Sequence, residues 1–295
     1  MIKALQNIKH SLVEKWDAFT DYTERMDKRV FNGVVIGIVL IVFALIMLLH
    51  HSRNRVHDLP YILKNGRLTV LTDSSQMGFS VKNGNVCGFQ YEIVKAFADS
   101  LGVELVISEE NDFGKCREAI KNGDYDIIAN FIPVTTDWKK DVAFTDPLNM
   151  SKQVLVQRVE TDSTKSTFKL KHKRIELAND SVYIPLNSPF KMRLEHLSDE
   201  IAEPIHIIEL KNTSTEQMVR MVSQGKIKYT ICDEDVAEQM VLKYPNLDVS
   251  LLISFEQQQA WAVHKDAHKL LEQLNGFLHD FIGSSEYWKI YRKYY

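Results

Sequence analysis

Acidic and hydroxyl side chains occur where three predicted strands end. Asp73 follows the segment RLTVLT, Thr135 and Thr136 lie in the loop after YDIIANF, and Asp233 follows KYTIC. In open α/β sheets, ligands bind beyond the carboxyl ends of the strands. Carboxylates and hydroxyls at these positions are therefore candidates for hydrogen bonding to a ligand. For Asp233, in the run DED, a solvated turn is an equally weighted interpretation.

Enzyme signatures do not accompany these side chains. The sequence contains neither a G-x-S-x-G motif nor a phosphate-binding loop. We find no glutamate whose sequence context predicts the apolar, proton-retaining site of a glycosidase acid. His50, His51 and His57 lack a cysteine or carboxylate at metal-ligand spacing. We therefore expect a non-enzymatic protein with no catalytic residue, no metal and no cofactor.

Alternating strand and helix patterns must position the candidate residues. The first series predicts strands at RLTVLT (67–72), VELVIS and YDIIANF, with helices over Tyr91–Leu101 and Phe113–Lys121. The second series has strands at VYIPL, IHIIEL and KYTIC, with helices over Pro189–Leu197 and Glu216–Ser223. The tail from Trp261 to Tyr295 adds a strand and two helices. This βαβαβ rhythm predicts two α/β units, each with a largely parallel sheet, and a ligand cleft between them.

Two hydroxyl residues stand where helices of the second series begin. Ser188 lies at the start of one helix, and Thr213-x-x-Glu216 has the spacing of a capping box at another. These residue types cap helices in many proteins, so capping is the favoured interpretation for both Ser188 and Thr213 over ligand binding.

An uncharged stretch precedes the two units. Val30–Leu49 contains twenty residues without a charge, and a helix of that length spans about 30 Å, the thickness of a bilayer's hydrocarbon core. The stretch is too long, and begins too late, for a cleavable signal peptide. We predict a transmembrane signal anchor over residues 30–50, an amphipathic helix over residues 1–29 in the cytoplasm, a linker over residues 51–59, and the remaining chain outside the cytoplasm.

Composition describes an ordinary folded chain. The protein has 295 residues, of which 45% are hydrophobic and 25% charged, and its formal net charge is −3. Residues 1–29 carry six basic and five acidic side chains, and residues 53–295 carry thirty and thirty-four. This balance argues against a nucleic-acid partner, which would require clustered basic residues. Three cysteines, Cys87, Cys116 and Cys232, indicate no disulfide framework.

Several long segments resemble a known family. GRLTVLTD, GNVCGFQYEIVKAFADSLGVEL and AIKNGDYDIIANFIPVTTDWKKDVAFTDPL resemble, in order and spacing, the amino-acid-type solute-binding proteins of family 3, which have the type 2 periplasmic-binding fold. QGKIKYTICDEDVA, KYPNLDV and YWKIYRKYY are also similar to the N-terminal domain of the membrane-bound lytic murein transglycosylase F family, without its catalytic domain. The resemblance extends from Arg67 to Tyr295. It implies a hinged clamp, with lobe 1 over residues 60–156 and 254–295 and lobe 2 over residues 157–253.

The resemblance also implies a ligand-binding set, with changes. Trp138 occupies the position of the arginine that clamps the ligand α-carboxylate in amino-acid-binding members, and it either packs in the protein or stacks on a ligand. Gln76 replaces the usual stacking aromatic residue, although Phe79 follows closely. Asp233 corresponds to the carboxylate that meets a ligand ammonium group. The implied set is Asp73, Phe79, Thr135, Thr136, Trp138, Ser188 and Asp233.

Together these features predict a periplasmic solute-binding or sensor domain anchored by a single span in a bacterial inner membrane. Loss of the clamping arginine disfavours a simple α-amino acid and favours a larger ligand such as a peptide or a cell-wall fragment. All three stay open as the small-molecule ligand. One alternative is a lytic-transglycosylase-like or accessory protein in peptidoglycan turnover. A weaker alternative is the receptor of an amino-acid importer of the ABC type. A partner protein in the membrane is left open.

Overall fold

The computed structural model describes residues 28–53, 56–82, 84–159 and 170–295. The chain divides into two units, residues 1–54 and 55–295. The helix predicted over residues 1–29 lies almost wholly outside the described residues.

The first unit is represented by one helix, α2 (Lys28–Arg53). The apolar side chains described along it are exposed, among them Ile36, Leu40 and Phe43. Several other side chains of α2 lie outside the described residues. A helix with the length and apolar content of a membrane span is not found within the described part of the chain. The anchor over residues 30–50 stays a prediction.

The second unit begins with a sheet in the order β4-β1-β5-β13-β6, with β7 also pairing with β13. Its strands are β1 (Arg67–Thr72), β4 (Glu104–Glu109), β5 (Ile127–Pro133), β6 (Val142–Phe144), β7 (Asn149–Ser151) and β13 (Gln257–His264). β1 is parallel to both β4 and β5, whereas β13 is antiparallel to β5. The short hairpin of β2 (Ser80–Lys82) and β3 (Asn85–Cys87) lies outside this sheet.

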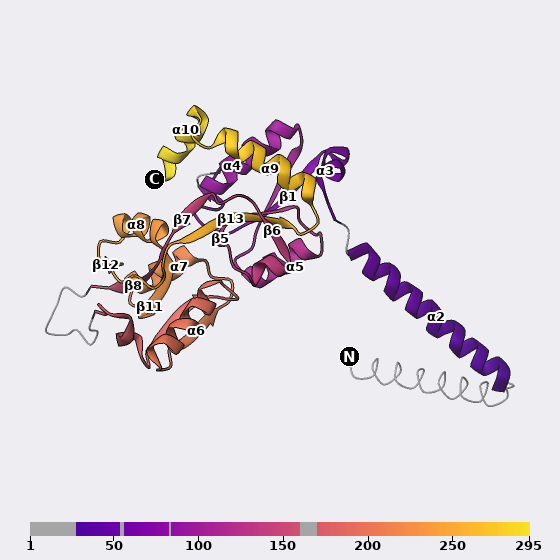
Figure 1. Ribbon diagram of the computed structural model, residues 1–295, viewed down its shortest axis with the longest axis horizontal. Helices are drawn as coiled ribbons and strands as arrows, with labels where there is room; N and C mark the ends of the chain where they lie inside the picture. The colour runs from indigo at the N-terminus through magenta and orange to yellow at the C-terminus, as the bar shows by residue number, and fades with distance from the viewer. Residues whose placement is uncertain (1–27, 54–55, 83, 160–169) are drawn as a thin grey trace, which may run out of the picture. The chain divides into compact units, whose positions relative to one another are not determined.

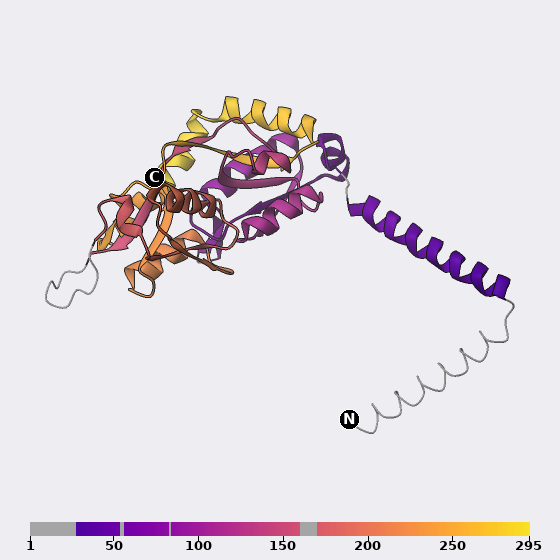
Figure 2. The same ribbon diagram turned by 60° about the horizontal axis from the view of Figure 1, so that its bottom comes forward.

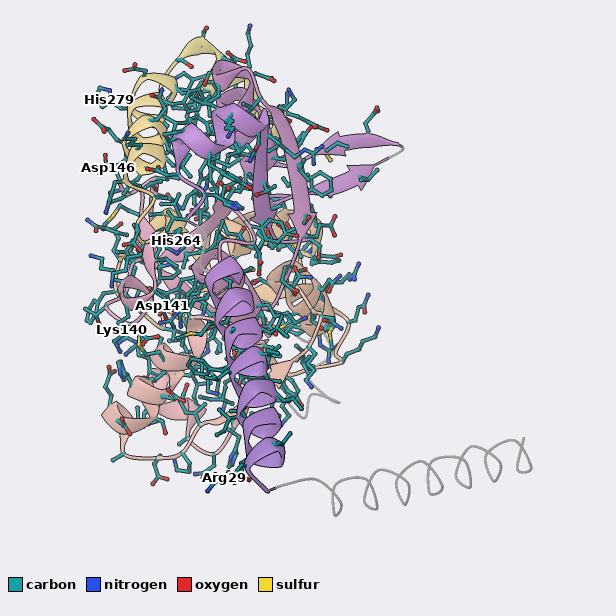
Figure 3. The ribbon with its side chains drawn as sticks, turned by 90° about the vertical axis from the view of Figure 1, so that its right-hand side faces the viewer. Arg29, Lys140, Asp141, Asp146, His264 and His279 are labelled. Carbon is teal, nitrogen blue, oxygen red and sulfur yellow. The ribbon has the colours of Figure 1, made fainter. Side chains whose placement is uncertain are left out.

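Helices cover both faces of this sheet (Figure 1). One face packs against α3 (Leu59–Asn65), α4 (Phe89–Leu101), α9 (His268–Phe281) and α10 (Ser285–Tyr294), with Phe97 and Trp261 fully buried between the layers. The other face packs against α5 (Phe113–Lys121). Figure 2 shows from a second side that α9 and α10 run over this part of the chain near α4. Asp146 and His279 mark the α9 side in Figure 3, where the Asp146 N–H donates to Asn275 Oδ1 at 3.0 Å.

A second sheet has the order β10-β9-β11-β8-β12. Its strands are β8 (Gln153–Arg158), β9 (Ser181–Pro185), β10 (His206–Leu210), β11 (Tyr229–Asp233) and β12 (Leu247–Asp248). α6 (Phe190–Ile201) packs on one face, and α7 (Thr215–Ser223) and α8 (Glu234–Lys243) pack on the other. We call the first sheet with its helices the first lobe (56–152 and 255–295), and the second the second lobe (153–254).

The chain passes between the lobes at two adjacent points, before Gln153 and after Ser254. The Gln153 N–H donates to Ser254 Oγ at 2.8 Å, and the Ile253 N–H donates to the Gln153 carbonyl at 2.7 Å. The Gln153 side chain also donates to Gln257 Oε1 at 3.1 Å. These hydrogen bonds tie the two crossings together. The lobe boundary predicted after Val156 falls within β8, all of which lies in the second sheet.

The two predicted helix caps differ from those observed. The capping box of α7 uses Ser214 and Gln217, one residue later than predicted, because the Thr213 hydroxyl donates to the Lys211 carbonyl and the Glu216 side chain contacts Gln76 of the first lobe. α6 follows Pro189, and Ser188 makes no capping hydrogen bond. The prediction that Ser188 and Thr213 cap these helices was therefore wrong.

Candidate functional site in the cleft between the lobes

A small cavity of about 70 Å³ lies where the two lobes meet. Asp73, Asn130 and Gln259 line it from the first lobe, and Glu216 and Asp233 line it from the second. We call it the inner cavity. Hydrogen bonds join the lobes at Glu216, one of the lining residues: the Gln76 N–H donates to Glu216 Oε1 at 2.9 Å, and Lys243 Nζ donates to Gln76 Oε1 at 2.5 Å. The described conformation is thus one in which the lobes touch across the site.

Asp73 reaches the inner cavity because a tight turn follows β1. The Asp73 carbonyl accepts the Phe79 N–H at 3.0 Å, and its carboxylate accepts the Ser75 hydroxyl at 3.0 Å. The Ser75 Oγ in turn accepts the Gly78 N–H at 2.8 Å. Gly78 lacks a side chain, and a Cβ added to it would overlap both the carboxylate and the carbonyl oxygen of Asp73. This glycine therefore fixes the position of the Asp73 carboxylate.

Asp233 enters the same cavity from the end of β11. It stands at the N-cap position of α8, yet its side chain makes no capping hydrogen bond. The carboxylate instead receives a hydrogen bond from Gln259 of the first lobe. Gln259 is held by Asn149, whose Nδ2 donates to Gln259 Oε1 at 3.0 Å and to Asp235 Oδ2 at 2.5 Å. Asp233 is thus available to the cavity and tied to the opposite lobe.

Burial of the two carboxyls dominates the electrostatics of the inner cavity. The pKa of Asp73 is raised to about 7, chiefly by desolvation and in smaller part by nearby Glu216, against the opposing effect of the Ser75 hydrogen bond. Desolvation likewise raises the pKa of Asp233 to about 7, with Asp235 adding a like charge and the Gln259 hydrogen bond opposing. The ionised forms lack a compensating cation, since none of the described residues lining the cavity is Lys, Arg or His.

A wider groove of about 700 Å³ adjoins the inner cavity, and Phe113 and Pro189 line both. Three residues of the implied ligand-binding set, Thr135, Trp138 and Ser188, line this groove. We call it the outer groove. The Ser188 hydroxyl is buried and has no hydrogen-bond partner in the structure. Two members of the set thus face the inner cavity and three face the outer groove.

Trp138 packs in the protein while one side of it borders the outer groove. Its side chain is buried in the cluster beneath α5 and lies 6.5 Å from the Phe144 ring. The Arg117 guanidinium lies 5.6 Å from the centre of the indole. Arg117 donates to Asp137 Oδ2 at 2.7 Å and pairs with Asp141 Oδ2 at 2.7 Å, so two carboxylates already occupy it. Asp141 is labelled beside Lys140 in Figure 3.

The remaining two members of the implied set line neither space. Phe79 packs edge-on against Tyr91 at 5.5 Å, and Thr136 is absent from both linings. Sequence reasoning missed Asn130, Gln259 and Asp235 as lining residues, and it considered Glu216 only for capping. Asn130 lies within β5 and not at the end of a predicted strand. The pairing of β5 with β1 is the only feature that points to Asn130 as a lining residue.

No cluster suited to a metal ion occurs among the described residues. Of the histidines considered in the sequence, His57 stacks on Tyr61 at 4.1 Å, and its Nδ1 lies 3.4 Å from Asp126 Oδ1. This pair belongs to the first lobe, away from the residues that line the inner cavity.

Comparison with known families gives one match that covers most of the chain. The model of the bacterial extracellular solute-binding proteins, family 3, matches residues 68–295. Curated relatives include membrane-bound lytic murein transglycosylase F of Desulfosudis oleivorans, 26% identical over 82% of this chain and 52% of that protein. The protein of the same name from Alcanivorax borkumensis is 26% identical over 81% of this chain and 49% of its own. The chain therefore spans about half the length of these relatives.

Solved structures share the two-lobed architecture. An ancestral arginine-binding protein bound to glutamine is 26% identical, with a TM-score of 0.63 over 78% of this chain and 98% of its own. The arginine-bound form of truncated ArgBP from T. maritima is 25% identical, with a TM-score of 0.63 over 76% of this chain and all of its own. The L-cysteine receptor of Neisseria gonorrhoeae, 18% identical with a TM-score of 0.68 over 80% of this chain and 93% of its own, shares the fold. The predicted α/β fold with two lobes of the type 2 periplasmic-binding class is confirmed.

Substitution of Gly78 tests the turn that positions Asp73. In Gly78→Ala the added Cβ must displace the Asp73 oxygens, and such overpacking costs about 1–3 kcal/mol of unfolding free energy. The matched control is Gly276→Ala in α9, where no atom lies within 4 Å of the added Cβ. Because alanine is the better helix former, the control should gain about 0.5–1 kcal/mol. Urea unfolding of the full chain measures both, and equal stability of the two variants would contradict the role assigned to Gly78.

The raised carboxyl pKa values predict a pH dependence of stability. Between the unfolded pKa of 3.8 and the folded value of about 7, the folded protein binds more protons than the unfolded chain. The unfolding free energy without ligand should therefore fall as the pH rises through this window. Asp73→Asn and Asp233→Asn should each flatten that decline and exceed the wild type in stability at about pH 8. Urea titrations across the window measure this, and slopes identical to wild type in both variants would refute it.

Proposed function

Because this chain belongs to family 3 of the bacterial extracellular solute-binding proteins, we propose that its two lobes close on a small ligand that carries a cationic amino group. One observation carries the proposal. Asp73, Glu216, Asp233 and Asp235 line one cavity between the lobes, and no described residue of that lining is basic. A bound cation would favour the ionised forms of Asp73 and Asp233 and so lower the raised pKa values of these two groups.

The environment of the outer groove supports a ligand in which the cation dominates recognition. Trp138 supplies no positive charge, and Arg117 is already bound by Asp137 and Asp141. A ligand α-carboxylate would therefore find no unengaged arginine beside Trp138. Two structural neighbours are described as arginine-binding or arginine-bound, and arginine carries a cationic side chain. Amino acids with a cationic side chain, and peptides that carry one, are accordingly the ligands that we favour.

A cell-wall fragment is the second candidate ligand, and binding it would give the chain an accessory role in peptidoglycan turnover. The observation that favours it is the name of the curated relatives, which are lytic murein transglycosylases. The stem peptides of such fragments carry free amino groups, so the inner cavity would recognise them by the same chemistry. No cleavage reaction is assigned to this chain.

We also propose that the N-terminal part tethers this domain to the bacterial inner membrane, with the two lobes on the periplasmic side. The uncharged stretch Val30–Leu49 lies within α2, and its described apolar side chains are exposed on all sides, from Val35 at 42% to Ile41 at 62%. Exposed apolar surface of this extent requires an apolar environment. The curated relatives are named membrane-bound.

Calorimetric titration of the full chain tests the ligand class. Arginine, lysine and amino-group-bearing muropeptides should bind, whereas glutamate should not, because the inner cavity repels a second carboxylate. Asp233→Asn removes a charge-assisted hydrogen bond and should weaken cation binding about tenfold or more. Asp146→Asn, at an exposed position outside the cavity, is the matched control and should leave affinity unchanged. Equal binding of glutamate, or no effect of Asp233→Asn, would remove the basis for the proposal.

Membrane fractionation tests the tether. The full chain should sediment with membranes and stay there after washing with alkaline carbonate, which strips peripheral proteins. Deletion of residues 30–49 should release the protein into the soluble fraction, since about twenty apolar residues provide the insertion energy. Recovery of the full chain in the wash would show that the stretch does not span the bilayer.

A further inference from the structure

A second pocket, of about 170 Å³, lies beside the inner cavity. Phe89, Tyr287, Tyr291 and Tyr295 line it from the first lobe, and Asp235 and Glu238 of α8 line it from the second. We call it the tyrosine pocket. No motif in the sequence assigned it a function.

The packing of α10 builds one wall of this pocket. Phe89 makes edge-on contacts with Tyr287, Tyr291 and Tyr295 at ring-centre distances of 6.2, 6.3 and 5.4 Å. Tyr294 anchors the helix, since its hydroxyl accepts the Gly88 N–H at 2.7 Å and donates to Glu92 Oε1 at 2.5 Å. These contacts pack α10 onto the first lobe. The side of the tyrosine cluster that faces α8 is left open as the pocket.

Aromatic rings and carboxylates are the two groups that proteins use to bind organic cations. The ring face attracts a cation through its quadrupole, and the carboxylate attracts it by charge. None of the described residues that line the tyrosine pocket is Lys, Arg or His. The outer groove differs in this respect, because Lys115, Arg117 and Lys191 line it. The tyrosine pocket and the inner cavity thus share carboxylates with no basic residue in the described lining, whereas the carboxylates of the outer groove stand beside basic residues.

The inner cavity and the tyrosine pocket adjoin each other. Gln90, Phe131, Asp235 and Tyr295 line both of them. The inner cavity, at about 70 Å³, is far below the roughly 300 Å³ at which pockets enclose a whole small molecule. A ligand whose amino group enters it must extend elsewhere, and the shared lining residues Phe131 and Tyr295 place the tyrosine pocket, with its own carboxylates, next to the inner cavity.

We propose that the inner cavity and the tyrosine pocket together bind one linear diamine or polyamine. This proposal rests on the proposed function and names its ligand class. One ammonium group binds among Asp73, Glu216 and Asp233, and the methylene chain passes between Phe131 and Tyr295. The second ammonium group binds at Asp235 and Glu238 against the tyrosine rings. Such a ligand has no carboxylate. This accords with the lack of a positive charge at Trp138 and with the guanidinium of Arg117, which is already bound by two carboxylates.

The experiment compares amines of matched chain length on the full chain in detergent micelles. Putrescine, cadaverine and hexamethylenediamine are titrated calorimetrically beside butylamine, arginine and lysine. At least one diamine should bind ten times more tightly than butylamine or either amino acid. Glu238→Gln should weaken that diamine about tenfold and leave butylamine within twofold, because the monoamine uses only the inner cavity. Glu272→Gln, on the exposed face of α9, is the matched control and should change neither.

Two further variants separate packing from binding. Tyr291→Phe keeps the ring and should keep the affinity for the diamine, whereas Tyr291→Leu should weaken it while circular dichroism confirms the fold. If arginine or lysine binds in a manner sensitive to Asp233→Asn, but diamines bind no better than butylamine and Glu238→Gln has no effect, the diamine proposal is overturned and the proposed function stands. If no amine of either kind binds, both are overturned.

Discussion

Negative charge gathered between the lobes governs the energetics of this molecule. Asp73 and Asp233 come from different lobes, and each faces a further carboxyl group, Glu216 for Asp73 and Asp235 for Asp233. The Glu216–Asp73 repulsion acts across the cleft, so it grows as the lobes approach. Closure without a ligand therefore either retains protons on these carboxyls or brings unscreened like charges together. A cation in the cavity removes both costs, which couples ligand charge to lobe closure.

Hydrogen bonds across the cleft oppose this repulsion. Asn187 Nδ2 donates to Asp112 Oδ1 at 2.9 Å, and the Gln76 N–H donates to Glu216. The lobes also meet without spare room at Gly114, where a Cβ would lie 2.7 Å from Asn187 Nδ2. Each bond contributes about 0.5–1.5 kcal/mol, or somewhat more where a carboxylate accepts. A few such bonds are comparable in free energy with the cost of one displaced carboxyl pKa, so the attraction and the repulsion between the lobes are of similar size.

Local signals in the sequence predicted the elements well, whereas contacts between lobes overrode them at particular points. Arg67–Thr72 and Phe113–Lys121 form the predicted strand and helix at the predicted residues, since strand and helix patterns are local features of the sequence. The capping box of α7 uses Ser214 in place of the predicted Thr213, because the Glu216 side chain accepts a hydrogen bond from Gln76 of the opposite lobe. The predicted lobe boundary fell inside β8 because β8 pairs with β11, about seventy residues later, and such a distant pairing leaves no local signal in the sequence.

The residues of the candidate site also fall into two groups, those with a local signal in the sequence and those that depend on contacts between the lobes. Asp73 and Asp233 could be found because a carboxylate at a strand end is a local feature, and the parallel order of the sheets fixes where such ends lie. Gln259 and Asp235 could not, because their role exists only once β13 of one lobe faces α8 of the other. The tyrosine pocket adds Phe89 to Tyr291 and Tyr295, some two hundred residues apart. Charged residues of the candidate site can be read from strand ends, but the tyrosine pocket depends on the docking of α10 and on the contact between the lobes.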